Sequence, residues 1–163
     1  MLRNKRTVLE IIFISVIVLT LLFIFSRSAK SKEESSAESD AVGDVVEEII
    51  PDDAPGKDFV VINIRKIAHF VEFAILGIEI AVYVLLLHKR RLFIAASYPA
   101  GLIFAFLDET VQVFSRRGPS ITDVWIDFIG FALFSSLVYV IYLAVRLIAG
   151  LRRCSVKGGS SNG

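Results

Sequence analysis

The sequence predicts an all-α membrane protein with four transmembrane helices and an acidic outer loop that carries a short amphipathic helix. More than half of the 163 residues are hydrophobic (55%). Apolar runs long enough to cross a bilayer begin near residues 7, 59, 92 and 121, and runs of about 18 residues or more are typical of membrane-spanning helices. A polar segment separates the first run from the other three. The length fits one domain, divided into residues 1–25, 26–58, 59–151 and 152–163.

The first apolar run covers residues 7–25 and follows a basic start that contains Arg3, Lys5 and Arg6. A basic start and an apolar core are also typical of a signal peptide. However, the core is long for a cleaved signal, and residues 26–29 make a poor cleavage site. We therefore predict an uncleaved helix, which at ~1.5 Å per residue spans ~28 Å, about one hydrocarbon thickness.

Residues 26–58 form the predicted outer loop, with ten acidic and four basic residues. Such a composition predicts flexibility in the first part of the loop. Further on, i, i+3, i+4, i+7, i+8 spacing is followed by Val42, Val45, Val46, Ile49 and Ile50. This spacing predicts an amphipathic helix of about three turns before Pro51. This helix could lie on the membrane surface or cap the bundle, or it could be a marginal helix in a solvated loop.

The second predicted helix covers residues 59–87 and is interrupted by polar residues. Positions 65, 69, 72, 76 and 79 fall on one helical stripe, so most of the polar groups share a face. Gly77 lies near that stripe and would allow a second helix to approach closely.

The third predicted helix covers residues 92–114. Pro99 removes a backbone hydrogen bond and predicts a kink. Gly101 and Ala105 form a small-xxx-small pair that favours tight helix packing. Asp108 and Gln112 are four residues apart and share a face.

The fourth predicted helix covers residues 121–148. Ser120 is a typical N-cap, and Asp123 in the first turn complements the helix dipole. Asp123, Asp127 and Gly130 lie along one stripe. The tail, residues 152–163, is basic and then rich in Gly and Ser, and we expect it to be disordered.

The distribution of Lys and Arg predicts the orientation, because cytoplasmic loops carry an excess of these residues. With four helices, the N-terminus, the 88–91 loop and the C-terminal tail share a side, which we predict to be cytoplasmic. The acidic loop is then outside. Cations at the three cytoplasmic segments are Arg3, Lys5, Arg6, Lys89, Arg90, Arg91, Arg152, Arg153 and Lys157.

Ionisable residues from three helices are predicted at a similar depth below the outer headgroups. At ~1.5 Å per residue, His69 and Glu72 lie ~5 and ~9 Å inward from Lys66, Asp108 lies ~9 Å from the end of its helix, and Asp127 ~10 Å from Ser120. Charged groups at such depth are costly and usually mark a functional site. The alternative is a set of ion pairs that only fixes the packing of the helices.

The residue types in this layer limit the chemistry. Arginine suits phosphate recognition through its planar donors. His69, Asp108 and Glu109 are candidate general acids and bases. Asp and Glu side chains with His69 could also bind a divalent metal. However, no metal-binding spacing such as HExxH and no cysteine cluster is present, so we expect neither a metal nor a cofactor. The sequence has no basic stripe of the kind that binds nucleic acid, so we expect no nucleic-acid partner.

Two blocks of sequence resemble the VanZ-like family of small bacterial membrane proteins. One block is IRKIAHFVEF at residues 64–73, followed by Leu76-Gly77; it is similar to the family pattern RK-x-x-HF-x-E-[YF]-x-x-LG. The other is DETVQVF at residues 108–114 with Arg117, Ser120 and DVWIDFIG at residues 123–130. Val111 stands where many relatives carry histidine, which argues further against a metal.

The family's named member is associated with low-level resistance to teicoplanin, a glycopeptide that binds cell-wall precursors. The resemblance therefore implies a protein that acts at the outer leaflet of the bacterial plasma membrane. Combined with the orientation predicted from Lys and Arg, both termini are expected to be cytoplasmic and the polar pocket to face outward. Its expected partners are membrane lipids, including a lipid-linked cell-wall precursor. The predicted ligand-binding residues are Arg65, Lys66, His69, Glu72, Asp108, Glu109, Gln112, Arg117, Ser120, Asp123 and Asp127. Within this set, Arg65, Lys66 and Arg117 are expected to hold the anion.

Two other functions stay open at this point. The protein could be an enzyme that modifies such a lipid, with His69 and Asp108 or Glu109 as acid and base. It could also be an ion-coupled transporter, for which four helices without an internal repeat are few. The sequence predicts no oligomeric state.

Overall fold

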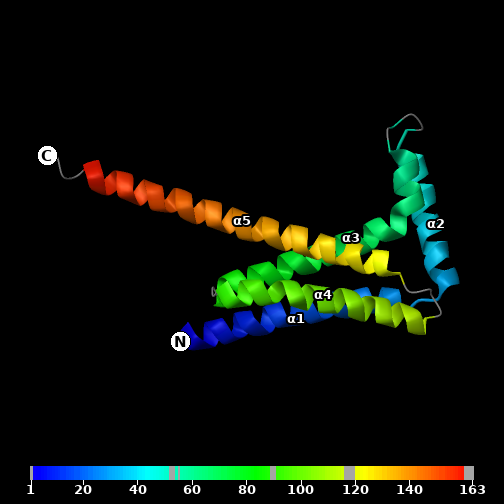
Figure 1. Cartoon of the computed structure of the whole chain (residues 1–163), viewed down its shortest axis with the longest axis horizontal. Coiled ribbons are helices and arrows are strands. Elements are labelled where there is room, and N and C mark those ends of the chain that lie inside the picture. Colours follow the sequence, from blue (N-terminus) through cyan, green and yellow to red (C-terminus); the bar gives the residue numbers. More distant parts are fainter. Residues whose placement is uncertain (1, 52–53, 55, 89–90, 116–119, 160–163) are drawn as a thin grey trace.

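The computed structural model describes residues 2–51, 54, 56–88, 91–115 and 120–159. Every regular element within these residues is helical (Figure 1). The elements are α1 (Leu2–Ser28), α2 (Lys32–Ile49), α3 (Lys57–Tyr83), the π-helical turn η1 (Val84–His88), α4 (Arg91–Phe114) and α5 (Ile121–Gly159).

Within the described residues, four segments are long and apolar enough to cross a membrane. They are Lys5–Ser28, Lys57–Leu87, Arg91–Phe114 and Ile121–Leu151. The prediction of an all-α membrane protein with four transmembrane helices is confirmed.

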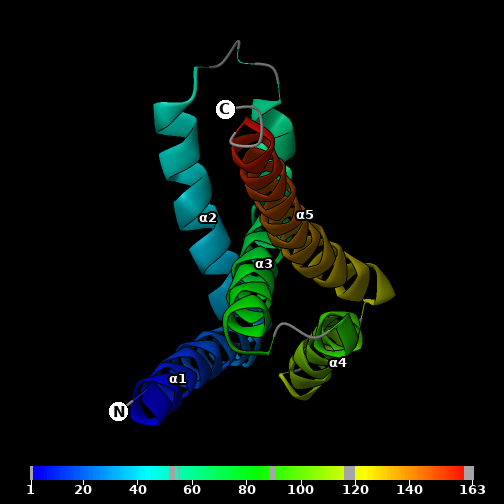
Figure 2. The same cartoon turned by 90° about the vertical axis from the view of Figure 1, so that its left-hand side faces the viewer.

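Helix α3 is the central element, because it contacts each of the other four α-helices. Viewed end-on, α3 lies between α1 and α5 (Figure 2). The N-terminal end of α1 and the C-terminal end of α5 lie at the same end of the molecule, together with η1 (Figure 1). Helix α2 lies at the opposite end.

Glycines allow α3 and α5 to cross closely. A Cβ at Gly77 of α3 would overlap the backbone oxygen of Phe131, and one at Gly130 of α5 would overlap the backbone oxygen of Phe70. A Cβ at Gly101 of α4 would overlap the ring of Phe131, which is fully buried. The structure thus confirms the close approaches predicted at Gly77 and Gly101.

Helix α2 begins earlier than predicted and includes residues that we expected to be flexible. A capping box starts it: the Ser31 hydroxyl accepts from the Glu34 N–H (3.2 Å), and the Ser31 N–H donates to Glu34 Oε2 (3.0 Å). These two bonds satisfy backbone donors that otherwise lack partners at a helix start. The structure thus places residues 32–41, which we expected to be flexible, in the same helix as the predicted amphipathic stretch.

Helix α2 packs against the beginning of α3. Gly43 of α2 is buried there, and a Cβ added to it would lie 3.6 Å from the Ile64 side chain of α3. Lys57 Nζ also donates to the backbone oxygen of Glu47 (3.1 Å). Helix α2 and the first turns of α3 run across the direction of α1 and α4 (Figure 1). Helix α2 therefore caps one end of the bundle.

The end of α5 also differs from the prediction. We expected disorder from residue 152, but the helix continues to Gly159. An isolated glycine such as Gly150 costs a helix only about 1 kcal/mol, so it does not end an otherwise favourable segment. The first pair of adjacent glycines, Gly158 and Gly159, comes at the end of the helix.

Candidate functional site

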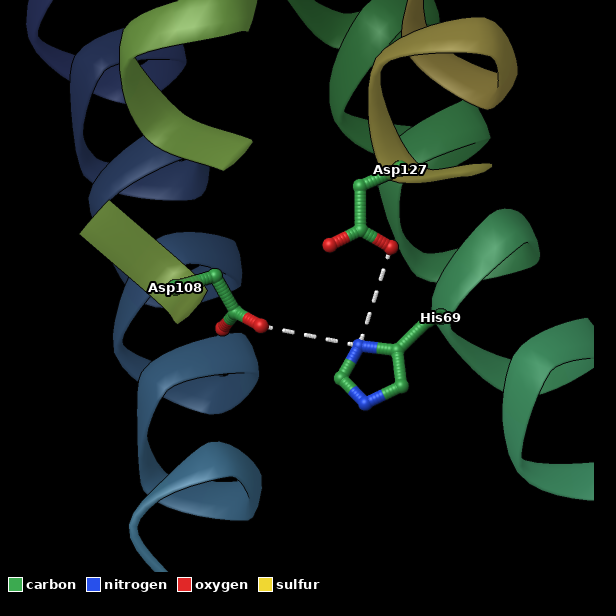
Figure 3. Close-up of side chains that lie close together, drawn as sticks. All are labelled: His69, Asp108 and Asp127. Carbon is green, nitrogen blue, oxygen red and sulfur yellow. Dashed lines mark ion pairs between the residues drawn. The ribbon is translucent and has the colours of Figure 1, made fainter. Parts of the chain in front are cut away.

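Three buried side chains from three helices meet near the α2 end of the bundle. His69 comes from α3, Asp108 from α4 and Asp127 from α5 (Figure 3). His69 Nδ1 lies 3.7 Å from Asp108 Oδ2 and 3.8 Å from Asp127 Oδ1. Both aspartates are fully buried, and His69 is 9% exposed. We call these three residues the His-Asp-Asp cluster.

Asp108 is held by two further hydrogen bonds. The Ser28 hydroxyl, at the end of α1, donates to Oδ1 (2.6 Å), and Gln112 Nε2 donates to Oδ2 (2.9 Å). Asp127 differs, because neither of its carboxylate oxygens has a hydrogen-bond partner among the described residues. One aspartate is thus fixed in place, while the other faces the cluster without a donor in the described part of the chain.

Glu109 connects α4 to the start of α5. Its carboxylate accepts a hydrogen bond from the backbone N–H of Ser120. The Ser120 hydroxyl in turn accepts from the Asp123 N–H (3.3 Å), which confirms the predicted N-cap.

A cavity of about 470 Å³ adjoins the cluster between α2 and α3. Its apolar wall includes Val42 and Val46 of α2 and Val60, Ile64 and Ile67 of α3. Its polar lining includes Arg27, Ser35, Glu38, Ser39, Arg65, His69 and Glu72. His69 therefore belongs both to the cluster and to the cavity lining.

Ion pairs fix the two arginines of the cavity. Arg27 Nε lies 3.0 Å from Glu72 Oε1, and its Nη2 lies 3.7 Å from Glu38 Oε2. Arg65 Nη2 lies 3.6 Å from Asp123 Oδ2. The side chains of both arginines are 38% exposed, so both keep access to a ligand.

The structure brings most of the predicted residues together. His69, Asp108, Glu109, Gln112 and Asp127 are buried. Arg65 and Glu72 line the cavity, and Ser120 and Asp123 lie at the start of α5. Lys66 is exposed and does not line the cavity. Arg117 lies outside the described residues.

Sequence reasoning missed Arg27 and Ser28. We assigned both to the outer loop, whereas the structure places them at the end of α1. There Ser28 donates to Asp108 and Arg27 pairs with Glu72.

One imidazole and two carboxylates in a buried space can hold a proton or a cation. A protonated His69 would form ion pairs with both aspartates. A metal ion would take the same three groups as ligands, because one atom from each lies within 4.8 Å of the others. Among the described residues, no other group of three His, Cys, Asp or Glu side chains has such an arrangement.

Comparison with known proteins gives one match. A family model described as VanZ/LLP1 matches residues 11–144. No curated protein and no solved structure matches the chain. The matched region runs from α1 to α5 and includes the whole His-Asp-Asp cluster and all of the cavity lining.

Proposed function

The chain belongs to the VanZ/LLP1 family, and from this premise we propose that it binds the phosphate-bearing headgroup of an anionic membrane lipid in the cavity between α2 and α3. The four spans make it a multi-pass membrane protein. The proposal places it in the bacterial plasma membrane, with the cavity at the outer leaflet.

The composition of the cavity is the observation that carries the proposal. An apolar wall of Val42, Val46 and Ile64 faces the same space as Arg27 and Arg65. A lipid presents the same combination, an anionic headgroup joined to an apolar tail. The volume of about 470 Å³ lies within the ~300–1,000 Å³ that is usual for small-molecule sites.

The arginines supply the chemistry for the phosphate. A guanidinium binds phosphate oxygens through two parallel hydrogen bonds, each assisted by charge. Glu72 and Asp123 hold Arg27 and Arg65 in position through the ion pairs described above. We therefore assign to Arg27 the anion-binding role that we expected for Lys66, because Arg27 lines the cavity and Lys66 does not.

The charge distribution supports the outer leaflet. The N-terminal end of α1 and the C-terminal end of α5 lie opposite α2 (Figure 1), and the basic residues near the chain's two ends favour the cytoplasm. The cavity beside α2 is then outside. A lipid-linked cell-wall precursor is one anionic lipid exposed at that face, and binding it would alter susceptibility to teicoplanin.

Lipid-resolved native mass spectrometry of the purified full-length protein tests the proposal. We expect one class of anionic phospholipid to be enriched on the wild type. Arg65→Gln should reduce its occupancy by about tenfold or more, because charge-assisted hydrogen bonds contribute about 1.5–3 kcal/mol. Lys66→Gln is the matched control, since it removes the neighbouring cation outside the cavity, and it should leave the lipid bound.

A second variant keeps all the charges. Val46→Trp should fill part of the cavity and displace the lipid while Arg27 and Arg65 stay in place. If the wild type and all three variants carry the same lipids in the same amounts, the proposal is wrong. Circular dichroism confirms that each variant is folded before its lipids are compared.

A further inference from the structure

We propose that His69, Asp108 and Asp127 form a binding site for a single divalent metal ion. Metal binding does not depend on the lipid proposal, since it uses atoms that face the interior of the bundle. No short spacing in the sequence predicts this site, because each ligand comes from a different helix. The absence of HExxH spacing excludes only ligands that are close together in the chain.

The distances between the three side chains suit a metal. His69 Nδ1 is 3.7 and 3.8 Å from the nearest oxygens of the two aspartates, and one ligand atom of each residue lies within 4.8 Å of the others. A metal held at ~2.0–2.2 Å from each ligand requires ligand atoms roughly 3–4.4 Å apart. Small rotations of the side chains would bring the three atoms into this range.

The direction of the side chains agrees with the distances. Nδ1 of the imidazole points toward both carboxylates, and Nε2 points away from them (Figure 3). An oxygen of Asp127 points toward the imidazole from the other side of the same space (Figure 3). The three groups therefore converge from three helices.

Asp127 gives the strongest reason to expect a cation. It is fully buried, and its oxygens have no hydrogen-bond donor among the described residues. Burying a carboxylate without donors costs several kcal/mol unless an opposite charge lies nearby. A divalent ion supplies that charge and is often the largest charge in such a site.

The surroundings of Asp108 are typical of a metal site. Metal-binding carboxylates are usually held in turn by hydrogen bonds from neighbouring side chains. Ser28 and Gln112 hold Asp108 in this way (2.6 and 2.9 Å). Gln112 Oε1 is a buried oxygen that has no hydrogen-bond partner among the described residues, so it adds a polar group beside the site.

The ligand types limit the choice of metal. One imidazole with two carboxylates suits Zn²⁺, Mn²⁺ or Fe²⁺ better than Ca²⁺, which prefers six or more oxygens. Three protein ligands leave coordination positions for water or a substrate oxygen, as in catalytic metal sites. His69 also lines the α2–α3 cavity. If the lipid proposal holds, the metal would therefore lie close to the bound headgroup.

Titration calorimetry of the chelator-treated, full-length protein tests the site with Zn²⁺ and Mn²⁺ separately. We expect the wild type to bind one ion per chain. Asp127→Asn should weaken binding by at least about tenfold, since even residues that only support ligands contribute 10–100-fold. Asp44→Asn is the control, because it removes an exposed acid of α2 that belongs neither to the cluster nor to the cavity lining, and it should bind like the wild type.

Pulsed electron paramagnetic resonance of the Mn²⁺-loaded protein needs no variant of the cluster. The chain contains two histidines, His69 and His88. We expect a signal from an imidazole nitrogen bound to Mn²⁺, in the wild type and equally in His88→Gln.

Two results would overturn the proposal. One is a folded wild type that binds neither ion stoichiometrically. The other is stoichiometric binding that Asp127→Asn retains at full affinity. Neither result depends on whether a lipid co-purifies, so the metal and lipid proposals fail separately.

Discussion

At the residue scale, Arg27 and Glu72 form the ion pair that closes the cavity on the side of α1. Their side chains are 38% and 12% exposed, and the two atoms are 3.0 Å apart. The pair Arg6 and Glu10, with side chains 60% and 32% exposed at the same separation, offers a more solvated comparison within one chain. The two pairs differ in burial and also in connection, because Arg27 and Glu72 join α1 to α3 whereas Arg6 and Glu10 lie on one helix.

A double-mutant cycle should measure this difference. We expect a coupling energy of about 1 kcal/mol between Arg27 and Glu72, using Arg27→Gln, Glu72→Gln and the double variant. Arg6 and Glu10 should give no more than about 0.3–0.5 kcal/mol, the usual value for exposed i, i+4 pairs. The measurement is reversible unfolding in detergent. Equal couplings would show that burial in the bundle does not strengthen the cavity pair.

At the scale of the single element, the capping box makes the start of α2 sensitive to pH. The pKa of Glu34 is lowered from its ordinary value of 4.5. The larger cause is the hydrogen bond from the Ser31 backbone N–H, and the second is the hydrogen bond with the Ser31 side chain. Charged Glu34 therefore stabilises α2 above pH 4.5, and this contribution is lost as the pH falls through the lowered pKa. Hydrogen exchange at residues 33–35, corrected for intrinsic rates, should accelerate in that range. Glu34→Gln should abolish the dependence.

The crossing of α3 and α5 should tolerate no side chain at its glycines. Gly77→Ala would place a Cβ against the backbone of Phe131, which cannot move as a side chain can, so we expect a loss of about 1–3 kcal/mol in unfolding free energy. Gly150→Ala is the control in α5, because nothing lies within 4 Å of its Cβ. Steric trapping in bicelles would compare the two. A Gly77 variant as stable as the wild type would contradict the tight crossing.

At the scale of the whole molecule, the proposed orientation can be tested with one native and one introduced thiol. Cys154 is the sole cysteine of the chain. In intact cells, a membrane-impermeant maleimide should leave Cys154 unlabelled and should label Ser39→Cys on α2 in a Cys154→Ser background. Permeabilised cells should label both. The reverse pattern would place the cavity at the cytoplasmic face.

The sequence predicts the spans of this molecule better than its site. Hydrophobic length locates four helices, and the small residues Gly77 and Gly101 predict where they touch. The His-Asp-Asp cluster could be predicted only as a shared depth, because its members are separated by about 20 to 40 residues and meet through tertiary packing. Ser28 escaped for the same reason: a serine at a helix end has no spacing that points to Asp108.

The length of α5 has a consequence for the membrane itself. Its apolar span, Ile121–Leu151, has 31 residues, whereas those of α1 and α4 have 24 each. At ~1.5 Å per residue it measures ~46 Å, well above a hydrocarbon thickness of ~30 Å. Such hydrophobic mismatch is relieved by tilt, and α5 indeed runs obliquely to α1 and α4 (Figure 1). Because Gly130 fixes where α5 meets α3, we expect a thinner bilayer to increase the tilt of α5 about that contact. The angle between α3 and α5 would then depend on bilayer thickness.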